Sequence, residues 1–188
     1  MSTNVYNLGS INRDQTIKVP RFPSPGETLS AQSSSSCLGG KGLNISLALH
    51  RAGQSVRHIG AVHEGDDETV SLIEGLGLTT DSLEVSPQPT GQALVFLDDE
   101  RENAIVVCAG ANQKISERHI DRCLSSAKAN DWLVLQNETN NQEYAIEQAK
   151  KKSMKIALVA APFDAHMVRS ILQDLNLIVL NEIEAEQL

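Results

Sequence analysis

The chain has 188 residues, of which 24 are acidic and 16 are basic, so its formal net charge at pH 7 is −8. This balance argues against nucleic acid as a partner, because nucleic-acid-binding proteins present a basic face. No apolar run approaches the roughly 20 residues that cross a bilayer, so we expect no membrane partner. The first residues do not resemble a secretory leader, and we expect a cytoplasmic location.

Three cysteines, Cys37, Cys108 and Cys123, are scattered along the chain. They form no C-x-x-C pair and no cluster with the spacing of a zinc site. We therefore expect three reduced thiols that pack as small buried hydrophobic side chains.

Short apolar runs alternate along the chain with segments of helical periodicity. The predicted strands cover residues 5–8, 56–62, 132–135, 156–160 and 177–180. The predicted helices cover 43–52, 66–76, a segment capped by Ser116, a segment that a capping box of Asn140 and Glu143 opens and that ends at Lys152, and 165–172. Apolar strands that alternate with helices are typical of a parallel sheet covered on both faces, so the predicted class is α/β.

Two regions, at about 15–37 and 83–108, depart from this alternation and contain strand patterns without helices. In the second region the apolar residues 93–97 occupy both faces of the expected strand. We predict a separate small antiparallel sheet inserted between the strand–helix units. Such a two-sided apolar sheet needs a cover, either a ligand or a partner subunit.

The densest polar motif is the glycine-rich stretch at residues 39–44, which contains Lys41 and precedes a predicted helix. Glycine lets the backbone approach a ligand closely, and a helix N-terminus offers free amide groups. The spacing matches neither the Walker loop nor the dinucleotide fingerprint, so an NAD-dependent oxidoreductase has only the strand–helix alternation in its favour. A purely structural turn is the alternative interpretation of the glycines.

Three further polar clusters also follow predicted strands, where ligands bind in open α/β sheets. Asn12 and Asp14 would face one side of an extended segment and suit sugar hydroxyls, although an Asx turn is an alternative. Asn137 and Glu138 follow the strand at 132–135. Asn181 and Glu184 would share a helix face and suit hydrated Mg²⁺ near phosphates, although Asn181 alone would more often be a helix cap.

Five stretches together resemble the ribokinase branch of the ribokinase/phosphofructokinase-B (pfkB) family of carbohydrate kinases. They are NRD at 12–14, FPSPGET at 22–28, GGKGLN at 39–44, AGAN at 109–112 and NEIE at 181–184. The resemblance runs from residue 4 to residue 188. It implies a Rossmann-like three-layer αβα fold with a small β-sheet lid, residues 1–188 forming part of that domain, and a homodimer in which the lids of two subunits meet.

The resemblance also implies a reaction: transfer of the ATP γ-phosphoryl group to a primary hydroxyl of a sugar, here D-ribose, giving D-ribose 5-phosphate. The residues that would bind the sugar are Asn12, Asp14, Gly40, Lys41, Gly42, Asn44 and Glu138. Asn181 would lie near the nucleotide phosphates, and Glu184 would act indirectly on Mg²⁺. A monovalent cation, K⁺, would complete the cofactors of the family.

The chain departs from the family pattern in one major respect. The family's Gly-Ala-Gly-Asp stretch, whose aspartate is the general base, has no counterpart here, and we expect that base beyond Leu188. We therefore expect the chain to carry the sugar-binding and lid portion of such a kinase and to be inactive alone. The alternative hypothesis is a non-catalytic chain derived from such a kinase that binds a sugar or forms a dimer through its lid.

Overall fold

The computed structural model describes residues 3–188. Its strands are β1 (Asn4–Leu8), β2 (Asn12–Lys18), β3 (Ser33–Gly39), β4 (Ser55–His63), β5 (Leu83–Ser86), β6 (Gly91–Leu97), β7 (Asn103–Cys108), β8 (Trp132–Gln136), β9 (Lys155–Val159) and β10 (Leu177–Val179). Its α-helices are α1 (Lys41–Arg51), α2 (Asp67–Gly75), α3 (Glu117–Leu124), α4 (Gln142–Lys151), α5 (Ala165–Ile171) and α6 (Glu182–Gln187), with short 3₁₀ turns at Gly110–Gln113 and Leu172–Asp174. Every strand and helix that the apolar pattern predicted is present.

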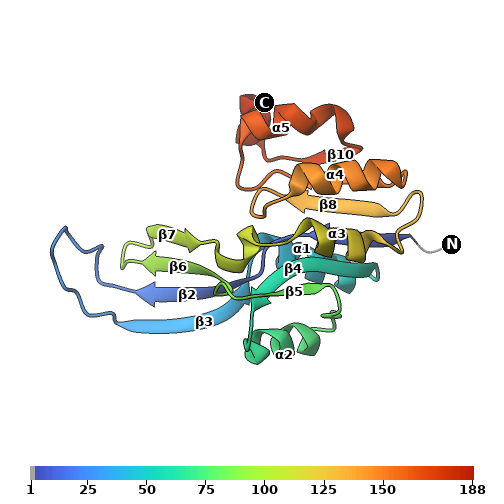
Figure 1. Cartoon of the computed structure of the whole chain (residues 1–188). Coiled ribbons are helices and arrows are strands. Elements are labelled where there is room, and N and C mark those ends of the chain that lie inside the picture. Colours follow the sequence, from blue (N-terminus) through green and yellow to red (C-terminus); the bar gives the residue numbers. More distant parts are fainter. Residues whose placement is uncertain (1–2) are drawn as a thin grey trace.

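The larger sheet has six strands in the order β10-β9-β8-β1-β4-β5, and all its pairs are parallel. Helices cover both faces, which makes three layers (Figure 1). Alternate residues of β1 show the division: Tyr6 and Leu8 pack in the cluster that includes residues of α3, α4 and α5, whereas Val5 packs with residues of α1. This is the α/β architecture that the alternation predicted.

The smaller sheet has four strands in the order β3-β2-β6-β7 and projects from the body of the molecule (Figure 1). The expectation of a purely antiparallel sheet is wrong, because β2 and β6 pair in parallel. These strands follow β1 and β5 after short connections, so both leave the carboxyl edge of the large sheet in the same direction. The region 83–108 also contains β5, which pairs with β4 and belongs to the large sheet.

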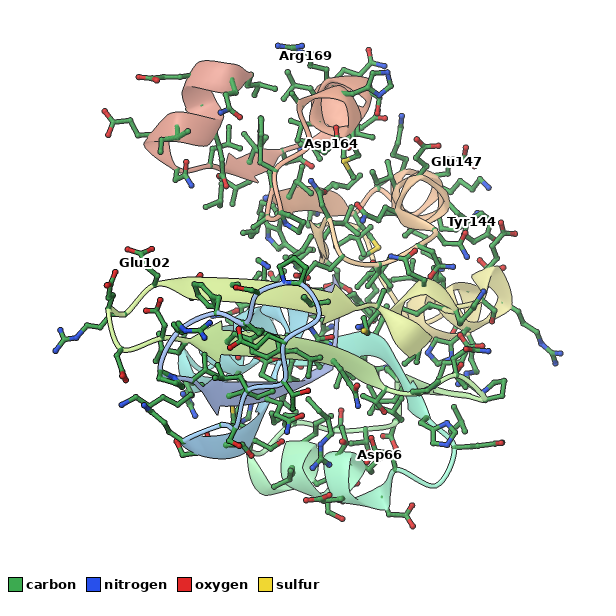
Figure 2. All side chains as sticks on the ribbon, turned by 90° about the vertical axis from the view of Figure 1, so that its left-hand side faces the viewer. Asp66, Glu102, Tyr144, Glu147, Asp164 and Arg169 are labelled. Atoms are coloured by element: carbon green, nitrogen blue, oxygen red, sulfur yellow. The ribbon has the colours of Figure 1, made fainter. Side chains whose placement is uncertain are left out.

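The helix starts show where local signals succeed and where they fail. Ser116 caps α3 by accepting a hydrogen bond from the amide of His119, as predicted. The capping box predicted at Asn140 is absent: α4 follows Asn141, and the Asn140 side chain bonds both backbone groups of Ile115, at 3.1 and 3.0 Å. Two aspartates, Asp66 and Asp164, cap α2 and α5, and they lie at opposite ends of the view in Figure 2.

The cysteine prediction is correct for one residue of three. Cys123, which belongs to α3, is buried, but Cys37 and Cys108 are exposed. Cys37 lies on β3 and Cys108 on β7, which are the two outer strands of the small sheet. Within residues 3–188, none of the helices is both long and apolar enough to cross a membrane.

Candidate functional site

The candidate site begins where the N-terminus of α1 meets the end of β1. A methyl group on Gly42 would lie 2.3 Å from the backbone nitrogen of Ser10 and 2.4 Å from the Cα of Gly9. Gly40 has a φ of +98°, and a methyl group there would lie 2.7 Å from the Ser10 carbonyl oxygen. Both positions therefore require glycine for the helix to approach the strand end this closely.

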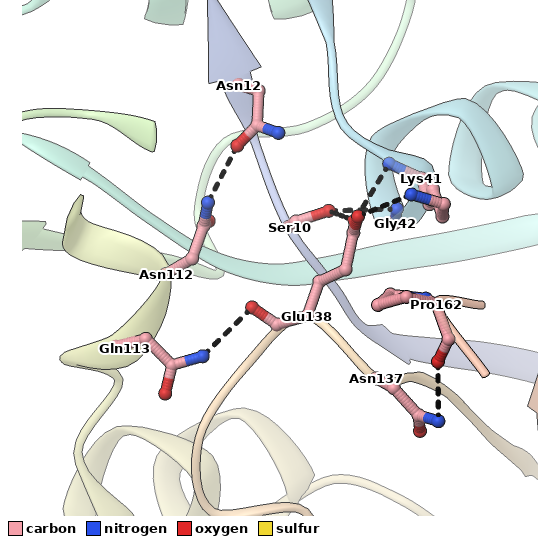
Figure 3. A network of polar contacts seen from close by, with 9 residues as sticks. All are labelled: Ser10, Asn12, Lys41, Gly42, Asn112, Gln113, Asn137, Glu138 and Pro162. Carbon is pink, nitrogen blue, oxygen red and sulfur yellow. Dashed lines mark hydrogen bonds and ion pairs between the residues drawn. The ribbon is translucent and has the colours of Figure 1, made fainter. Parts of the chain in front are cut away.

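A charged pair closes this junction (Figure 3). Lys41 Nζ lies 2.7 Å from Glu138 Oε1, and the backbone amide of Lys41 donates to Glu138 Oε2 at 3.2 Å. The Ser10 hydroxyl donates to the same Glu138 oxygen and accepts from the amide of Gly42 at 3.2 Å. The Glu138 side chain is only 12% exposed, while that of Lys41 is 49% exposed. The pair thus combines a nearly buried carboxylate with an ammonium group that remains open to solvent.

Asn12 is held by a second asparagine from a distant part of the chain. Asn112 Nδ2 donates to Asn12 Oδ1 at 2.8 Å, while Asn112 Oδ1 accepts from the amide of Ile11 at 2.9 Å. Both amide side chains are buried. A methyl group on Gly91 would lie 2.2 Å from Asn112 Nδ2, so that glycine leaves the space the pair occupies. These contacts fix the start of β2, on which Asp14 lies.

The Asp14 carboxylate has an unpaired oxygen at the site. Its Oδ1 atom is buried and has no hydrogen-bond partner among the described residues. Burial raises the pKa of the Asp14 carboxyl, the charge of Glu138 raises it further, and Lys41 opposes both effects. A methyl group on Gly39 would lie 2.0 Å from Asp14 Oδ2, so glycine also makes room for this carboxylate. A buried acceptor without a partner is costly unless a ligand donates to it.

The remaining predicted residues lie at the margin of this cluster or outside it. Asn44 is exposed in the first turn of α1, three residues after Lys41 and on the same helix face. Asn181 and Glu184 form a capping box at the start of α6, each side chain accepting from the other's backbone amide at 2.8 Å. No hydrogen bond within residues 3–188 joins this box to the cluster around Asp14.

Two residues that organise the site belong to the predicted motifs but were assigned no role from the sequence. Ser10 lies between the two predicted clusters and contacts Glu138 and Gly42, and Asn112 positions Asn12. Ser10 directly follows Gly9, and Asn112 is the last residue of the AGAN stretch at 109–112. Their roles depend on partners that are 128 and 100 residues away, which local spacing does not reveal.

The described residues do not form a metal centre of their own, because no group of three or more His, Cys, Asp or Glu side chains among them could hold an ion. The Glu184 carboxylate already accepts a hydrogen bond from the Asn181 amide, so it fits a Mg²⁺ ion that is held chiefly through water and nucleotide phosphates rather than by a protein cage.

The fold and the site define a class: a parallel α/β domain with a small projecting sheet and a carboxylate–lysine–amide cluster between them. Comparison with known proteins agrees. The model of the pfkB family carbohydrate kinases matches residues 2–188. The chain therefore belongs to the pfkB family of carbohydrate kinases.

Individual relatives with similar sequences and structures are also sugar kinases. The chain is 36% identical over 187 residues to a ribokinase of Haemophilus influenzae, covering 95% of this chain and 60% of that protein. It is 31% identical over 186 residues to a deoxyribokinase of Salmonella typhi, with 95% and 60% coverage. The structure of Arabidopsis thaliana ribokinase complexed with ribose and ATP matches with a TM-score of 0.83 at 26% identity, covering 100% of this chain and 63% of that chain.

The chain thus spans about 60% of the length of these relatives. Membership of a kinase family removes the NAD-dependent oxidoreductase from consideration, and it does not favour the non-catalytic alternative.

Proposed function

We propose that this protein takes part in the ATP-dependent phosphorylation of D-ribose to D-ribose 5-phosphate, and that the described residues bind the sugar. The observation that carries the proposal is the buried Asp14 oxygen without a partner, beside the charged pair of Lys41 and Glu138. Sugar hydroxyls both donate and accept hydrogen bonds. A carboxylate that accepts, a lysine that donates and an amide that does both would match several hydroxyls at once.

The residues would divide the work as follows. Asp14 would accept from one hydroxyl through Oδ1, with Asn12 beside it at the start of β2. Lys41 and Glu138 would exchange part of their mutual contact for contacts with other hydroxyls, while Gly40 and Gly42 keep the backbone close. Asn44 would complete the surface from the first turn of α1. The relatives named as ribokinases support a pentose, and the deoxyribokinase makes 2-deoxy-D-ribose the nearest competitor.

Phosphoryl transfer depends chiefly on positioning and on stabilisation of charge. In the proposal the described residues orient the acceptor hydroxyl, and none of them is assigned to proton transfer. Asn181 would lie near the nucleotide phosphates, and Glu184 would act on Mg²⁺ through water. The ion supplies charge neutralisation of the phosphates when bound. K⁺ has no assigned residue here.

We further propose that the small sheet is the contact surface of a homodimer. On β7, three consecutive apolar side chains are more than half exposed: Ile105 at 56%, Val106 at 52% and Val107 at 56%. Consecutive strand residues point to opposite faces, so both faces of this edge strand are uncovered. A second copy of the sheet would bury them.

Calorimetric titration tests the sugar assignment. D-Ribose should bind the wild-type chain more tightly than 2-deoxy-D-ribose, and Asp14→Asn should weaken D-ribose binding by tenfold or more, the usual effect of losing a hydrogen bond to a charged group. Glu143→Gln is a matched control, because it removes a carboxylate on α4 away from the cluster. Equal binding by wild type and Asp14→Asn would refute the assignment.

A further inference from the structure

A chain of buried polar side chains lies directly beneath the candidate site. Asn7 of β1, Gln136 of β8, Ser46 of α1 and His58 of β4 are each at most 1% exposed. Such groups are costly in an apolar core unless they bond one another. The hydrogen bonds among these side chains therefore show which elements the polar network holds together.

Asn7 is the centre of this polar network. Its Nδ2 donates to the carbonyl of Gly42 and to the hydroxyl of Ser46, both at 2.7 Å, and its Oδ1 accepts from Gln136 Nε2 at 2.8 Å. The Gly42 carbonyl can only accept, so it fixes which end of the Asn7 amide faces it. The Ser46 hydroxyl then meets His58 Nδ1 at 2.8 Å. Every donor and acceptor of the Asn7 side chain is used.

The two ends of this link stand next to the charged pair of the site. Gly42 directly follows Lys41, and Gln136 precedes Glu138 by two residues. The separation of the two charged residues therefore depends on how firmly the first turn of α1 is held against the end of β8. The side chains of Gln136 and Asn7 and the carbonyl of Gly42 form a hydrogen-bonded link between β8 and the first turn of α1.

We propose that Asn7 is a positioning residue that sets the distance between Lys41 and Glu138. Its consequence for sugar affinity rests on the proposed function, whereas its geometric part does not. The Ser46–His58 arm leads away from the charged pair, to β4, and serves core packing. A substitution that breaks the Gln136–Asn7–Gly42 link should therefore affect Lys41, whereas one that breaks the Ser46–His58 contact should not.

The test is the acylation rate of individual lysine amines, read by peptide mass spectrometry with N-hydroxysuccinimidyl acetate as the probe. In Asn7→Leu the Lys41 amine should react about threefold faster, the factor that a solvent-facing ion pair of moderate strength contributes. Lys150 is an internal control in the same sample, because it pairs with Asp174 and its side chain is 54% exposed, close to the 49% of Lys41.

Ser46→Ala is the matched control variant, since it removes a buried hydrogen bond of the same network but leaves the link between Gly42 and Gln136. Its Lys41 rate should equal that of wild type. An unchanged Lys41 rate in folded Asn7→Leu, or an equal rise in Ser46→Ala, would overturn the proposal. Should Asn7→Leu fail to fold, Gln136→Met removes only the β8 end of the link and decides in the same way.

Titration with D-ribose separates this inference from the proposed function. If wild type binds D-ribose, affinity should fall about tenfold in Asn7→Leu and remain within twofold in Ser46→Ala. If wild type binds no pentose, the proposed function fails, and the acylation rates still decide whether Asn7 positions Lys41.

Discussion

Replacement of Gly42 by alanine probes the junction on which the candidate site depends. Gly42 lies in the first turn of α1, in ordinary helical conformation, so alanine there brings no backbone strain. The added methyl group would instead lie 2.3 Å from the Ser10 nitrogen, 2.4 Å from the Gly9 Cα and 2.5 Å from the Gly9 carbonyl carbon. All three are backbone atoms, which no side-chain rotation can move away.

The magnitude follows from two opposing effects. Overpacking a well-packed region costs about 1–3 kcal/mol, and rigid backbone neighbours place this case at the upper end. Alanine in place of glycine within a helix gains about 0.5–1 kcal/mol. We therefore expect Gly42→Ala to lower the free energy of unfolding by about 2 kcal/mol. Relief by shifting α1 would also move Lys41 away from Glu138 and weaken D-ribose binding about tenfold.

Urea unfolding followed by circular dichroism measures the stability, and calorimetric titration measures the affinity. Gly75→Ala is the matched control: Gly75 is also helical, at the end of α2, and a methyl group there has nothing within 4 Å. That variant should gain up to about 1 kcal/mol and bind as wild type does. Equal stability of Gly42→Ala and Gly75→Ala would refute the close-approach argument.

Three other perturbations follow from burial and exposure. Burial lowers the pKa of His58 from 6.5 to about 4, so its contribution to stability is complete above pH 6.5. The His58 contribution should destabilise the fold by roughly 3 kcal/mol as the pH drops toward 4, because the unfolded state takes up the proton more readily; in urea unfolding across this range, the loss should be smaller by about that amount in His58→Phe than in wild type. D-Ribose binding should weaken as the pH falls through the raised pKa of Asp14, above the value of about 3.9 for an ordinary aspartate, since protonation removes an acceptor; titrations of Asp14→Asn should lack that dependence. Val106→Lys should weaken self-association in sedimentation at least tenfold, because it places a charge where an apolar side chain would be buried, and a monomeric wild type would contradict the dimer.

The sequence was sufficient for the large sheet, because parallel strands buried on both faces leave unbroken apolar runs. The apolar run at residues 132–135 identifies a buried strand without any knowledge of its neighbours in the fold. The polar clusters after β1 and β8 were also predictable in kind, since the carboxyl ends of parallel strands meet at one edge. The structure brings Asp14, Lys41 and Glu138 into mutual electrostatic range.

The errors arise where a distant partner overrides a local signal. Asn140 has the spacing of a capping box with Glu143, but it bonds the backbone of Ile115 instead. Strand direction in the small sheet depends on which edge of the large sheet its strands leave, and apolar patterning carries no direction. The exposure of Cys37 follows from an edge position that only the strand order shows.

The same limit explains the polar network beneath the site. Asn7 occurs within a short apolar strand, where a single amide carries no signal of its own. Its partners Ser46 and Gln136 are 39 and 129 residues away. Only the packing of α1 against β1 and β8 shows that these side chains form one network.

The most direct test of the proposed sugar site is a crystal structure of the chain grown with D-ribose. The account predicts one sugar at the carboxyl edge of β1, with a hydroxyl on the free Oδ1 of Asp14 and others on Lys41 and Glu138. A structure with D-ribose bound elsewhere, or with Asp14 Oδ1 facing only water at a sugar concentration that saturates binding, would contradict it.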